Sequence, residues 1–281
     1  MSRYRVVHKT GFRYAGPVAA SYNEVRMLPV KDDTQLLFAS KLEIRPHPAS
    51  HEYLDYFGTR VVMFEVLEPH SELEITSSNT VELRPAPEPT EGLSWEQLAL
   101  VIDRDLVLRD SVTQSKRTQI PADLTKAAKK LAAASATPAD AARAICGFIH
   151  SNMKYEFGVT GVQSNAAEAW SKRIGVCQDF THLTLGALRV VGIPARYVSG
   201  YLHPQLDPRI GQTVVGESHA WVEWYAGEWV SNDPTNNLVY TDRHIVVARG
   251  RDYDDVPPLR GVFAGEGTSE LFVSVEITRD V

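Results

Sequence analysis

The first part of the chain is dominated by short stretches in which apolar and polar side chains alternate. Alternation with a period of two is typical of β-strands that bury one face. Glycine and proline, as at Gly11, Gly16 and Pro17, interrupt the pattern where turns are expected. The predicted strands lie at residues 3–9, 25–28, 36–44, 60–66, 72–76 and 80–83. This regular series of short strands predicts a small N-terminal β-sandwich.

A proline-rich stretch follows these strands, with the sequence Pro85-Ala86-Pro87-Glu88-Pro89-Thr90. Segments of this composition are stiff and extended, as interdomain linkers often are. The stretch therefore predicts two domains, an N-terminal domain at residues 1–85 and a second domain at residues 86–281.

Beyond the linker the apolar spacing becomes that of helices. Ser94 to Gln97 carry a pattern that starts a helix, and residues 121–134 are rich in alanine and lysine. Thr137 and Pro138 fit the cap and first position of a helix that runs to about residue 153. We also expect a short helix at 165–170 and a helix at 178–191, which stops at Gly192.

The period of two returns after this last helix. Strands are predicted at 195–202, 219–225, 228–232, 245–248 and 271–277, with a loop at 203–216. Ala226 and Gly227 fit a tight turn that joins two of these strands into a hairpin. The whole pattern predicts an α+β protein. The final strand, residues 270–278, could pair with either domain.

Cys177 lies between a glycine and the start of the helix predicted at 178–191. The first turn of a helix offers unpaired N–H groups and the positive end of the helix dipole, and both favour a thiolate. A lone cysteine is more often a small buried apolar residue, and Cys146, within an apolar helical pattern, fits that description. Cys177 becomes a candidate nucleophile only if a base lies near it.

The hairpin supplies such a base and a group to orient it. His219 begins one strand, and Asp233 follows the end of its partner strand, 14 residues later. With a turn at Ala226-Gly227, antiparallel pairing places the two residues close together at one edge of the sheet. A nucleophile, a base and an orienting acid form the catalytic arrangement of cysteine and serine hydrolases.

Composition limits the kinds of partner. The chain has 281 residues, of which 43% are hydrophobic and 23% charged, and its net charge is −6 with a pI of about 5.9. This acidic balance provides no global positive field for nucleic acid or an anionic membrane. The sequence has two cysteines, no signal-peptide pattern and no apolar run of membrane-spanning length, so we expect a reducing cytoplasmic location.

Three segments resemble the core motifs of the bacterial transglutaminase-like superfamily. They are Gly175-Val176-Cys177-Gln178-Asp179-Phe180, Ser218-His219-Ala220-Trp221-Val222-Glu223 and Asn232-Asp233-Pro234-Thr235. The resemblance implies a papain-like Cys-His-Asp arrangement, with a helical part packed on an antiparallel sheet.

Weaker pieces extend this resemblance over nearly the whole chain. Tyr22 to Arg26 with Pro29, and Asp55 to Gly58, are similar to the β-rich domain that precedes the core in one bacterial branch. Gly250 to Pro258 with Gly261 is similar to the segment that follows the core. Thr59 departs from the asparagine expected there, which affects no catalytic residue.

Carried over to this sequence, the resemblance implies that Cys177 is the nucleophile, His219 the general base and acid, and Asp233 the residue that orients His219. The backbone N–H of Cys177 would donate to the oxyanion, with Tyr155 or Trp170 as a second donor. Segments 156–175 and 203–216 would form the groove walls. Further groove candidates are Gln178, Trp221 and Asp252.

These residues predict cysteine-dependent acyl transfer on a peptide or amide bond through a thioester. Water as the acceptor would make the protein a peptidase or amidase, which we favour, and an amine would make it a transglutaminase. A non-catalytic protein-binding module that retains the fold is a further alternative. The proposed chemistry needs no cofactor. The sequence has no HExxH, CxxC or EF-hand spacing, so no metal site is expected. The expected partner is a peptide or protein substrate.

Overall fold

Two antiparallel sheets form the β-sandwich in the computed structural model, which describes residues 2–84, 92–159, 161, 163–239 and 241–281. The five-stranded sheet has the order β10 (Thr213–Gly216), β16 (Ser269–Arg279), β1 (Ser2–Val18), β6 (His70–Leu83) and β3 (Gln35–Arg45). The four-stranded sheet has the order β15 (Leu259–Ala264), β2 (Ala20–Val25), β5 (Arg60–Val66) and β4 (Ala49–Leu54).

The core of the sandwich forms because the inward side chains of both sheets are apolar. On β6 the buried positions alternate with partly exposed ones, as the period of two predicts. The inner faces bury Tyr14, Val18, Val25, Met27, Ile44, Phe64, Val66, Leu73 and Ile75. The N-terminal β-rich part and the α+β fold class are thereby confirmed.

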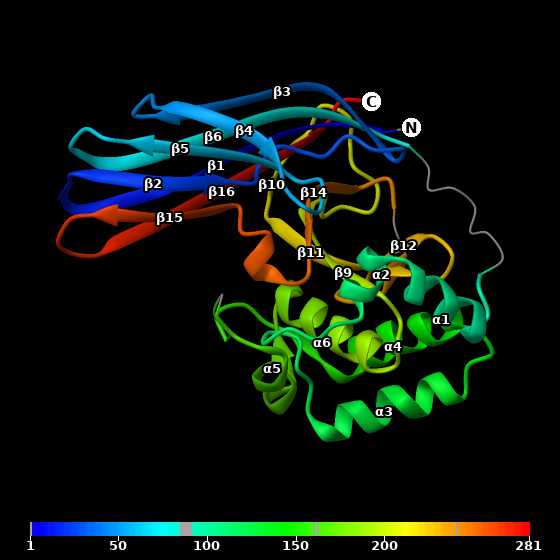
Figure 1. The fold of residues 1–281 in the computed structure, drawn as a ribbon. Coiled ribbons are helices and arrows are strands. Elements are labelled where there is room, and N and C mark those ends of the chain that lie inside the picture. The colour runs from blue at the N-terminus through cyan, green and yellow to red at the C-terminus, as the bar shows by residue number, and fades with distance from the viewer. Residues whose placement is uncertain (1, 85–91, 160, 162, 240) are drawn as a thin grey trace.

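The sandwich extends well beyond the N-terminal residues. β16 pairs with β1 from Tyr4↔Arg279 to Tyr14↔Ser269, and β15 pairs with β2. β10, which precedes β11, pairs with the other edge of β16. The final strand thus joins the five-stranded sheet of the sandwich, and the sandwich is not confined to residues 1–85 (Figure 1). The linker expected at Pro85 to Thr90 lies outside the described residues.

The second lobe packs helices on one antiparallel sheet (Figure 1). The sheet has the order β13 (Leu238–Val239), β12 (Trp229–Asp233), β11 (Ser218–Tyr225), β9 (Ala195–Leu202) and β14 (His244–Gly250). The helices are α1 (Trp95–Arg104), α2 (Leu106–Ser111), α3 (Ala122–Ala133), α4 (Pro138–Asn152), α5 (Ala166–Lys172) and α6 (Cys177–Val190). Smaller elements are β7 (Lys154–Tyr155), β8 (Ile174–Gly175) and the 3₁₀ turn η1 (Tyr253–Asp255).

α6 is the central helix of this lobe. It packs against β9 and β11 on one side and contacts α3, α4 and α5 on the others. Nearly all of its residues are buried, including Phe180, Leu183 and Ala187, which the apolar spacing predicted for its buried face. The helix that carries Cys177 is therefore held by contacts on several sides.

A buried ion network ties the two lobes together. Glu223 on β11 is 4% exposed and accepts hydrogen bonds from Arg196 Nε at 2.6 Å and Arg249 Nε at 2.9 Å. Arg249 also donates to Asp32 Oδ2, in the sandwich lobe, at 2.9 Å. The two arginines compensate the negative charge of this buried carboxylate.

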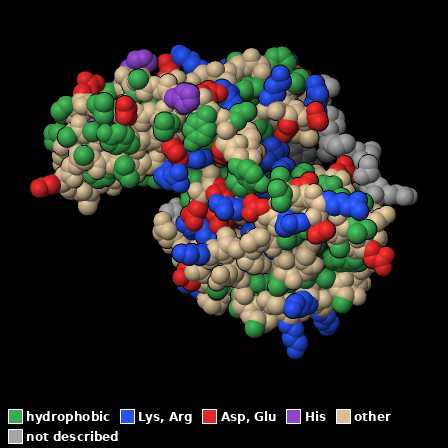
Figure 2. Space-filling model, viewed as in Figure 1, with side chains coloured by type: hydrophobic (Ala, Val, Ile, Leu, Met, Phe, Trp, Pro, Cys, Tyr) green, Lys and Arg blue, Asp and Glu red, His purple; other side chains and the backbone are tan. Residues whose placement is uncertain are grey.

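Acidic and basic side chains also gather at the waist between the lobes (Figure 2). Arg251 pairs with Asp255, and Arg117 pairs with Asp254. The Arg117 pair holds the segment around η1 against the helical lobe, and the Arg251 pair lies within that segment. Within the described residues, no helix combines the length and apolar character needed to cross a membrane.

Candidate active site

Cys177 is the first residue of α6, and the turn before it is fixed by Asp179. Asp179 Oδ2 accepts the backbone N–H of Val176 at 2.9 Å, and its Oδ1 accepts Ser164 Oγ at 2.8 Å. A Cβ on Gly175 would lie 2.7 Å from the Asp179 side chain, so only glycine fits there. The glycine before the cysteine thus permits the capping contact that positions the thiol.

The β11–β12 hairpin brings His219 to Asp233. The strands pair from Tyr225↔Trp229 to Val222↔Asn232, and one further step places Asp233 opposite Trp221, diagonal to His219 on the same face. His219 Nε2 lies 2.8 Å from Asp233 Oδ2. The sheet therefore places these two side chains in hydrogen-bond contact.

The Asp233 carboxylate is almost completely buried and surrounded by donors. Oδ1 accepts the backbone N–H groups of Thr235 at 2.9 Å and Asn236 at 3.2 Å, and Oδ2 accepts Asn236 Nδ2 at 2.8 Å. Burial alone would raise the pKa of this carboxyl, but hydrogen bonds from His219 and His244 hold it well below its usual range. Asp233 is therefore ionised at neutral pH.

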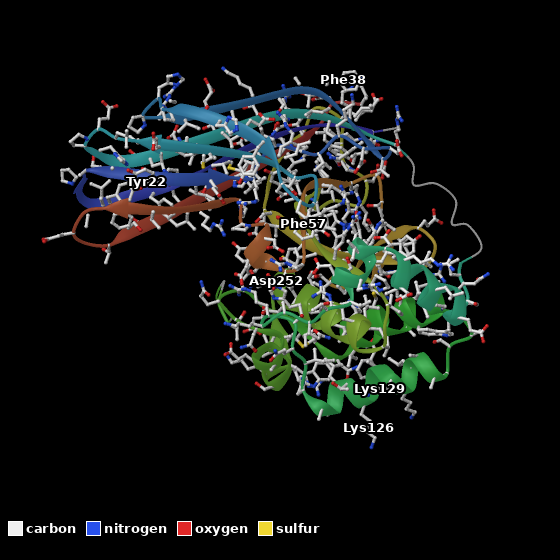
Figure 3. The ribbon with its side chains drawn as sticks, viewed as in Figure 1. Tyr22, Phe38, Phe57, Lys126, Lys129 and Asp252 are labelled. Atoms are coloured by element: carbon white, nitrogen blue, oxygen red, sulfur yellow. The ribbon has the colours of Figure 1, made fainter. Side chains whose placement is uncertain are left out.

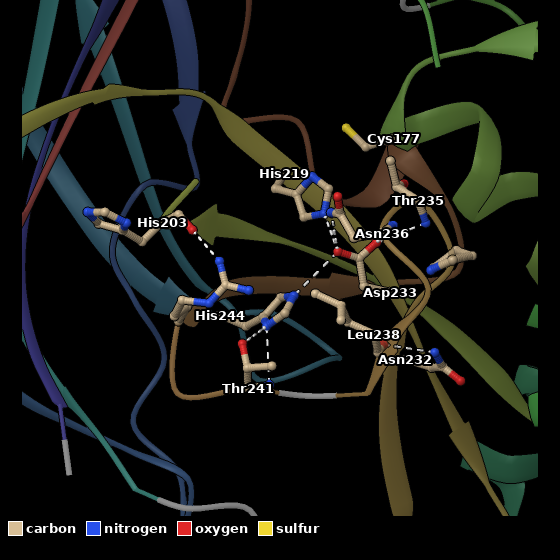
Figure 4. Close-up of polar contacts among 12 residues, drawn as sticks. Cys177, His203, His219, Asn232, Asp233, Thr235, Asn236, Leu238, Thr241 and His244 are labelled. Atoms are coloured by element: carbon tan, nitrogen blue, oxygen red, sulfur yellow. Dashed lines mark hydrogen bonds and ion pairs between the residues drawn. The ribbon is translucent and has the colours of Figure 1, made fainter. Parts of the chain in front are cut away.

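His219 lies between this carboxylate and the Cys177 thiol (Figure 4). Burial would lower the pKa of the imidazole, but the hydrogen bonds to Asp233 and Cys177 outweigh it and raise the pKa to about 10. The ring is consequently an imidazolium at neutral pH. A protonated imidazole next to a thiol is the arrangement that stabilises a thiolate.

His244, on β14, is a member of this cluster that sequence reasoning missed. The backbone N–H of Thr241 donates to His244 Nδ1 at 3.3 Å, which leaves the proton on Nε2. Nε2 then donates to Asp233 Oδ2 at 3.4 Å (Figure 4). Burial lowers the pKa of His244, so the ring is neutral. His244 carries no sequence signal for this contact, because its approach to Asp233 depends on the order of the strands in the sheet, which no local pattern shows.

Two adjoining hollows flank His219. The first, here the Cys177 hollow, has a volume of about 560 Å³ and includes Cys177, Gln178, Tyr197, Ser199, Tyr253 and Val273–Val275 in its lining. The second, here the His219 hollow, has a volume of about 780 Å³ and includes Leu202, Pro204, Leu206, Thr235, Asn236, Leu238 and Arg243. Tyr155, Phe157 and residues 215–219 line both.

Comparison with known proteins places this chain in a family. The sequence profile of the bacterial transglutaminase-like N-terminal region matches residues 4–82, and that of the transglutaminase-like superfamily matches residues 125–234. An uncharacterized protein of Mycobacterium leprae is 43% identical over 282 residues, which cover 99% of each chain. The chain belongs to the transglutaminase-like superfamily.

Other relatives are similar over different lengths. An uncharacterized protein of Mycobacterium tuberculosis is 35% identical over 98% of this transglutaminase-like chain and 92% of its own. A solved structure from Cytophaga hutchinsonii, described as a proposed cysteine protease, has a TM-score of 0.77 at 24% identity and covers 99% and 90% of the two chains. A protein-glutamine γ-glutamyltransferase of Pseudomonas aeruginosa is 40% identical over 67 residues, 22% of this chain and 10% of that protein.

The two candidate oxyanion donors lie in different surroundings. Tyr155 lines both hollows, and burial together with the charges of Cys177 and Glu217 raises the pKa of its hydroxyl, so it stays a donor. The indole N–H of Trp170 instead donates to Asp123 Oδ2 at 2.8 Å, inside a separate apolar cluster. This geometry does not support an oxyanion role for Trp170, because its only donor is already used.

The three groove candidates also separate. Gln178 lines the Cys177 hollow. Trp221 is 1% exposed and stacks behind His219, with a ring-centroid distance of 6.1 Å, so it supports the imidazole rather than a substrate. Asp252 lies beside η1 between the lobes (Figure 3), is buried, and accepts the backbone N–H of Asp254 at 2.8 Å. Trp221 and Asp252 thus have structural contacts and lie outside the lining of both hollows.

Among the described residues, one group has a ligand set that could hold a metal ion, namely His219, Asp233 and His244, whose ligand atoms lie within 4.8 Å of one another. The same atoms form the hydrogen bonds to Asp233 Oδ2. A metal ion at this position would displace both hydrogen bonds. The arrangement of the three side chains therefore fits a hydrogen-bonded group rather than a metal site.

The two thiols are expected to differ sharply in reactivity toward iodoacetamide. Cys177 lines an open hollow, whereas Cys146 is 1% exposed and its burial raises the pKa of its thiol to about 12. Alkylation at pH 7, followed by peptide mass mapping, should label Cys177 and leave Cys146 free. In denaturant both should react, and equal labelling of the folded protein would contradict the arrangement.

Proposed function

We propose that this transglutaminase-like protein is a cysteine-dependent acyltransferase that acts on peptide or amide bonds, with water as the main acceptor. The proposal rests on one observation: His219 contacts Cys177 on one side and the buried Asp233 carboxylate on the other. A nucleophile, a base and an orienting acid in this order suffice for covalent catalysis.

The first half of the reaction forms a thioester. The Cys177 thiolate attacks the substrate carbonyl carbon, and the electron pair of the C=O bond moves to oxygen. The backbone N–H of Cys177, in the first turn of α6 where N–H groups lack intrahelical partners, stabilises this oxyanion. As the intermediate collapses, the C–N bond breaks and imidazolium His219 gives its proton to the leaving amine.

The second half returns the enzyme to its starting state. Neutral His219 takes a proton from water, the resulting hydroxide attacks the thioester, and the C–S bond breaks to release a carboxylic acid. Cys177 leaves as the thiolate beside the imidazolium. Asp233 stays ionised throughout and keeps His219 Nε2 hydrogen-bonded, so that the opposite ring nitrogen faces the reacting atoms.

Transamidation is the second candidate. In that reaction an amine replaces water as the acceptor, and the same thioester serves both. The 67-residue similarity to a protein-glutamine γ-glutamyltransferase favours considering it. A protein-binding module without turnover is the non-enzymatic alternative. The cytoplasmic location expected from the sequence stays a prediction, which cell fractionation would test.

Product masses test the proposal directly. The protein is incubated with peptide and glutamine-amide libraries, with and without added amine, and then quenched in acid. We expect an acyl adduct on the peptide that contains Cys177, and free acids as the main products. Amide products with the added amine would favour transamidation. No adduct and no product, together with tight binding of a protein partner, would favour the binding module.

His244 is expected to raise kcat by holding the Asp233 carboxylate in position. His244→Phe keeps a ring but removes one hydrogen bond to a charged group, and kcat should fall about tenfold with little change in KM. Asp233 keeps its bonds from His219, Thr235 and Asn236, so it should stay ionised and the shape of the kcat/KM profile against pH should not change. His244→Gln retains a donor and should recover part of the rate. Equal behaviour of the two variants would show that His244 only fills space.

A further inference from the structure

The His219 hollow is large and apolar, although neither water nor ammonia would require such a site. Its volume is about 780 Å³, within the range of ligand-binding pockets. Most of its lining is apolar, with Tyr155, Phe157, Leu202, Leu206, Val215 and Leu238. Leu206 is 80% exposed and Val215 is 85% exposed, so both present apolar surface that a bound group would cover.

The reaction chemistry decides which part of a substrate this hollow faces. The acyl carbon is bonded to Cys177 Sγ, and Cys177 lines only the other of the two hollows. The leaving amine takes its proton from His219, and it extends from the carbonyl carbon in the direction opposite to the acyl chain. The acyl part therefore occupies the Cys177 hollow, and the amine part extends past His219.

The outer wall of the His219 hollow is held in place by a buried cation. Arg243 is 5% exposed, and its Nη1 donates to the backbone oxygens of His203 at 2.8 Å and Gln205 at 3.0 Å. These bonds fix the segment that carries Pro204 and Leu206 at the rim of the hollow. The apolar surface is thus presented by an anchored loop.

On the basis of the proposed function, we infer that the His219 hollow binds an apolar amine, the part of the substrate on the nitrogen side of the reacting bond. In hydrolysis this amine is a peptide whose first residue after the cleaved bond is apolar. In transamidation it is an apolar acceptor amine, because an attacking amine retraces the path of a leaving one. A primary carboxamide, which releases ammonia, would leave the hollow empty.

The inference is tested first with the unmodified protein and a proteome-derived peptide library. Cleavage sites identified by mass spectrometry should be enriched in leucine, isoleucine, phenylalanine or methionine directly after the cut bond. Added leucinamide should also be incorporated into products more efficiently than glycinamide. This second arm tests the hollow with an acceptor amine, whereas the library tests it with a leaving amine. No side-chain preference in either arm would overturn the inference.

Two variants then test the hollow itself, Leu206→Lys and Pro204→Lys, at exposed positions that line only this hollow. Each should lower kcat/KM for a cleaved peptide at least about tenfold more than for the same acyl sequence as a primary amide. Leu106→Lys is the matched control, since Leu106 on α2 is 73% exposed and lies outside both hollows. Equal losses on the two substrates would refute the assignment.

Failure of the inference and failure of the proposed function give different results. Acyl transfer by the parent protein without any apolar preference overturns only the inference. If Cys177 alkylates normally and yet no acyl transfer occurs on any substrate, the proposed function is wrong, and the inference is wrong with it.

Discussion

Cys177→Ala is expected to lower kcat/KM by at least about a thousandfold, because the thioester can no longer form. What remains is stabilisation by substrate binding and oxyanion donors. Folding should change little, since the thiol is only partly buried at the start of α6. Activity on a peptide that the parent cleaves, measured with thermal unfolding of the same samples, would check both expectations.

Cys146→Ala is the matched control for this variant. Cys146 is on the buried face of α4, within the hydrophobic core, and takes no part in the proposed chemistry. Its replacement should cost about 1 kcal/mol of stability, as for a small cavity, and should leave kcat/KM close to that of the parent. If Cys177→Ala kept the parent's rate, acyl transfer through Cys177 would be excluded.

Among the variants considered, Glu223→Ala is expected to lower the free energy of unfolding most. Glu223 is the buried carboxylate shared by Arg196 and Arg249, and its removal leaves Arg196 without this partner and Arg249 with Asp32 alone. Breaking a buried ion pair in this way typically costs about 3–5 kcal/mol. Urea unfolding should show the loss, whereas Glu65→Ala, at an exposed position on β5, should stay within about 0.5 kcal/mol.

The effect of Glu223 should also depend on pH in a defined direction. Burial opposes ionisation, but the two arginines lower the pKa of Glu223 to about 2 in the folded protein. A folded pKa below the unfolded value of about 4.3 means that the stabilisation is complete above that value. It is lost as the pH falls toward 2. The difference in unfolding free energy between the parent and Glu223→Ala should therefore shrink over this interval, and a constant difference would contradict the ionised pair.

The sequence predicted those parts of the site that depend on local pattern. The turn at Ala226-Gly227 determines the hairpin register, and the register brings Asp233 within two positions of His219. The apolar spacing of α6 likewise places Cys177 at a helix start. Both signals are local. The association of Cys177 with the hairpin, over forty positions away, was instead an implication of the resemblance to the superfamily motifs.

Contacts between segments that lie far apart in the sequence could not be predicted from a local pattern. The apolar and polar residues of β16 alternate in a way that would suit a sheet of either domain. Its pairing with β1 shows which sheet it joins. The partner of the Trp170 indole, Asp123, lies on a different helix, so nothing near Trp170 indicated that its N–H was used. His244 is only 11 positions from Asp233, and it was missed because their contact depends on the order of the strands in the sheet.

The order of the strands has a consequence for biosynthesis. β16 is translated after the other described strands, yet it is a neighbour of β1 in one sheet, and Val273 to Val275 of β16 line the Cys177 hollow. A nascent chain can therefore contain Cys177, His219 and Asp233 while one side of the hollow is still absent. Pairing between segments this far apart in the sequence forms late, because the chain between them must be made first. The Cys177 hollow therefore gains its last wall only once β16 has emerged from the ribosome and paired with β1.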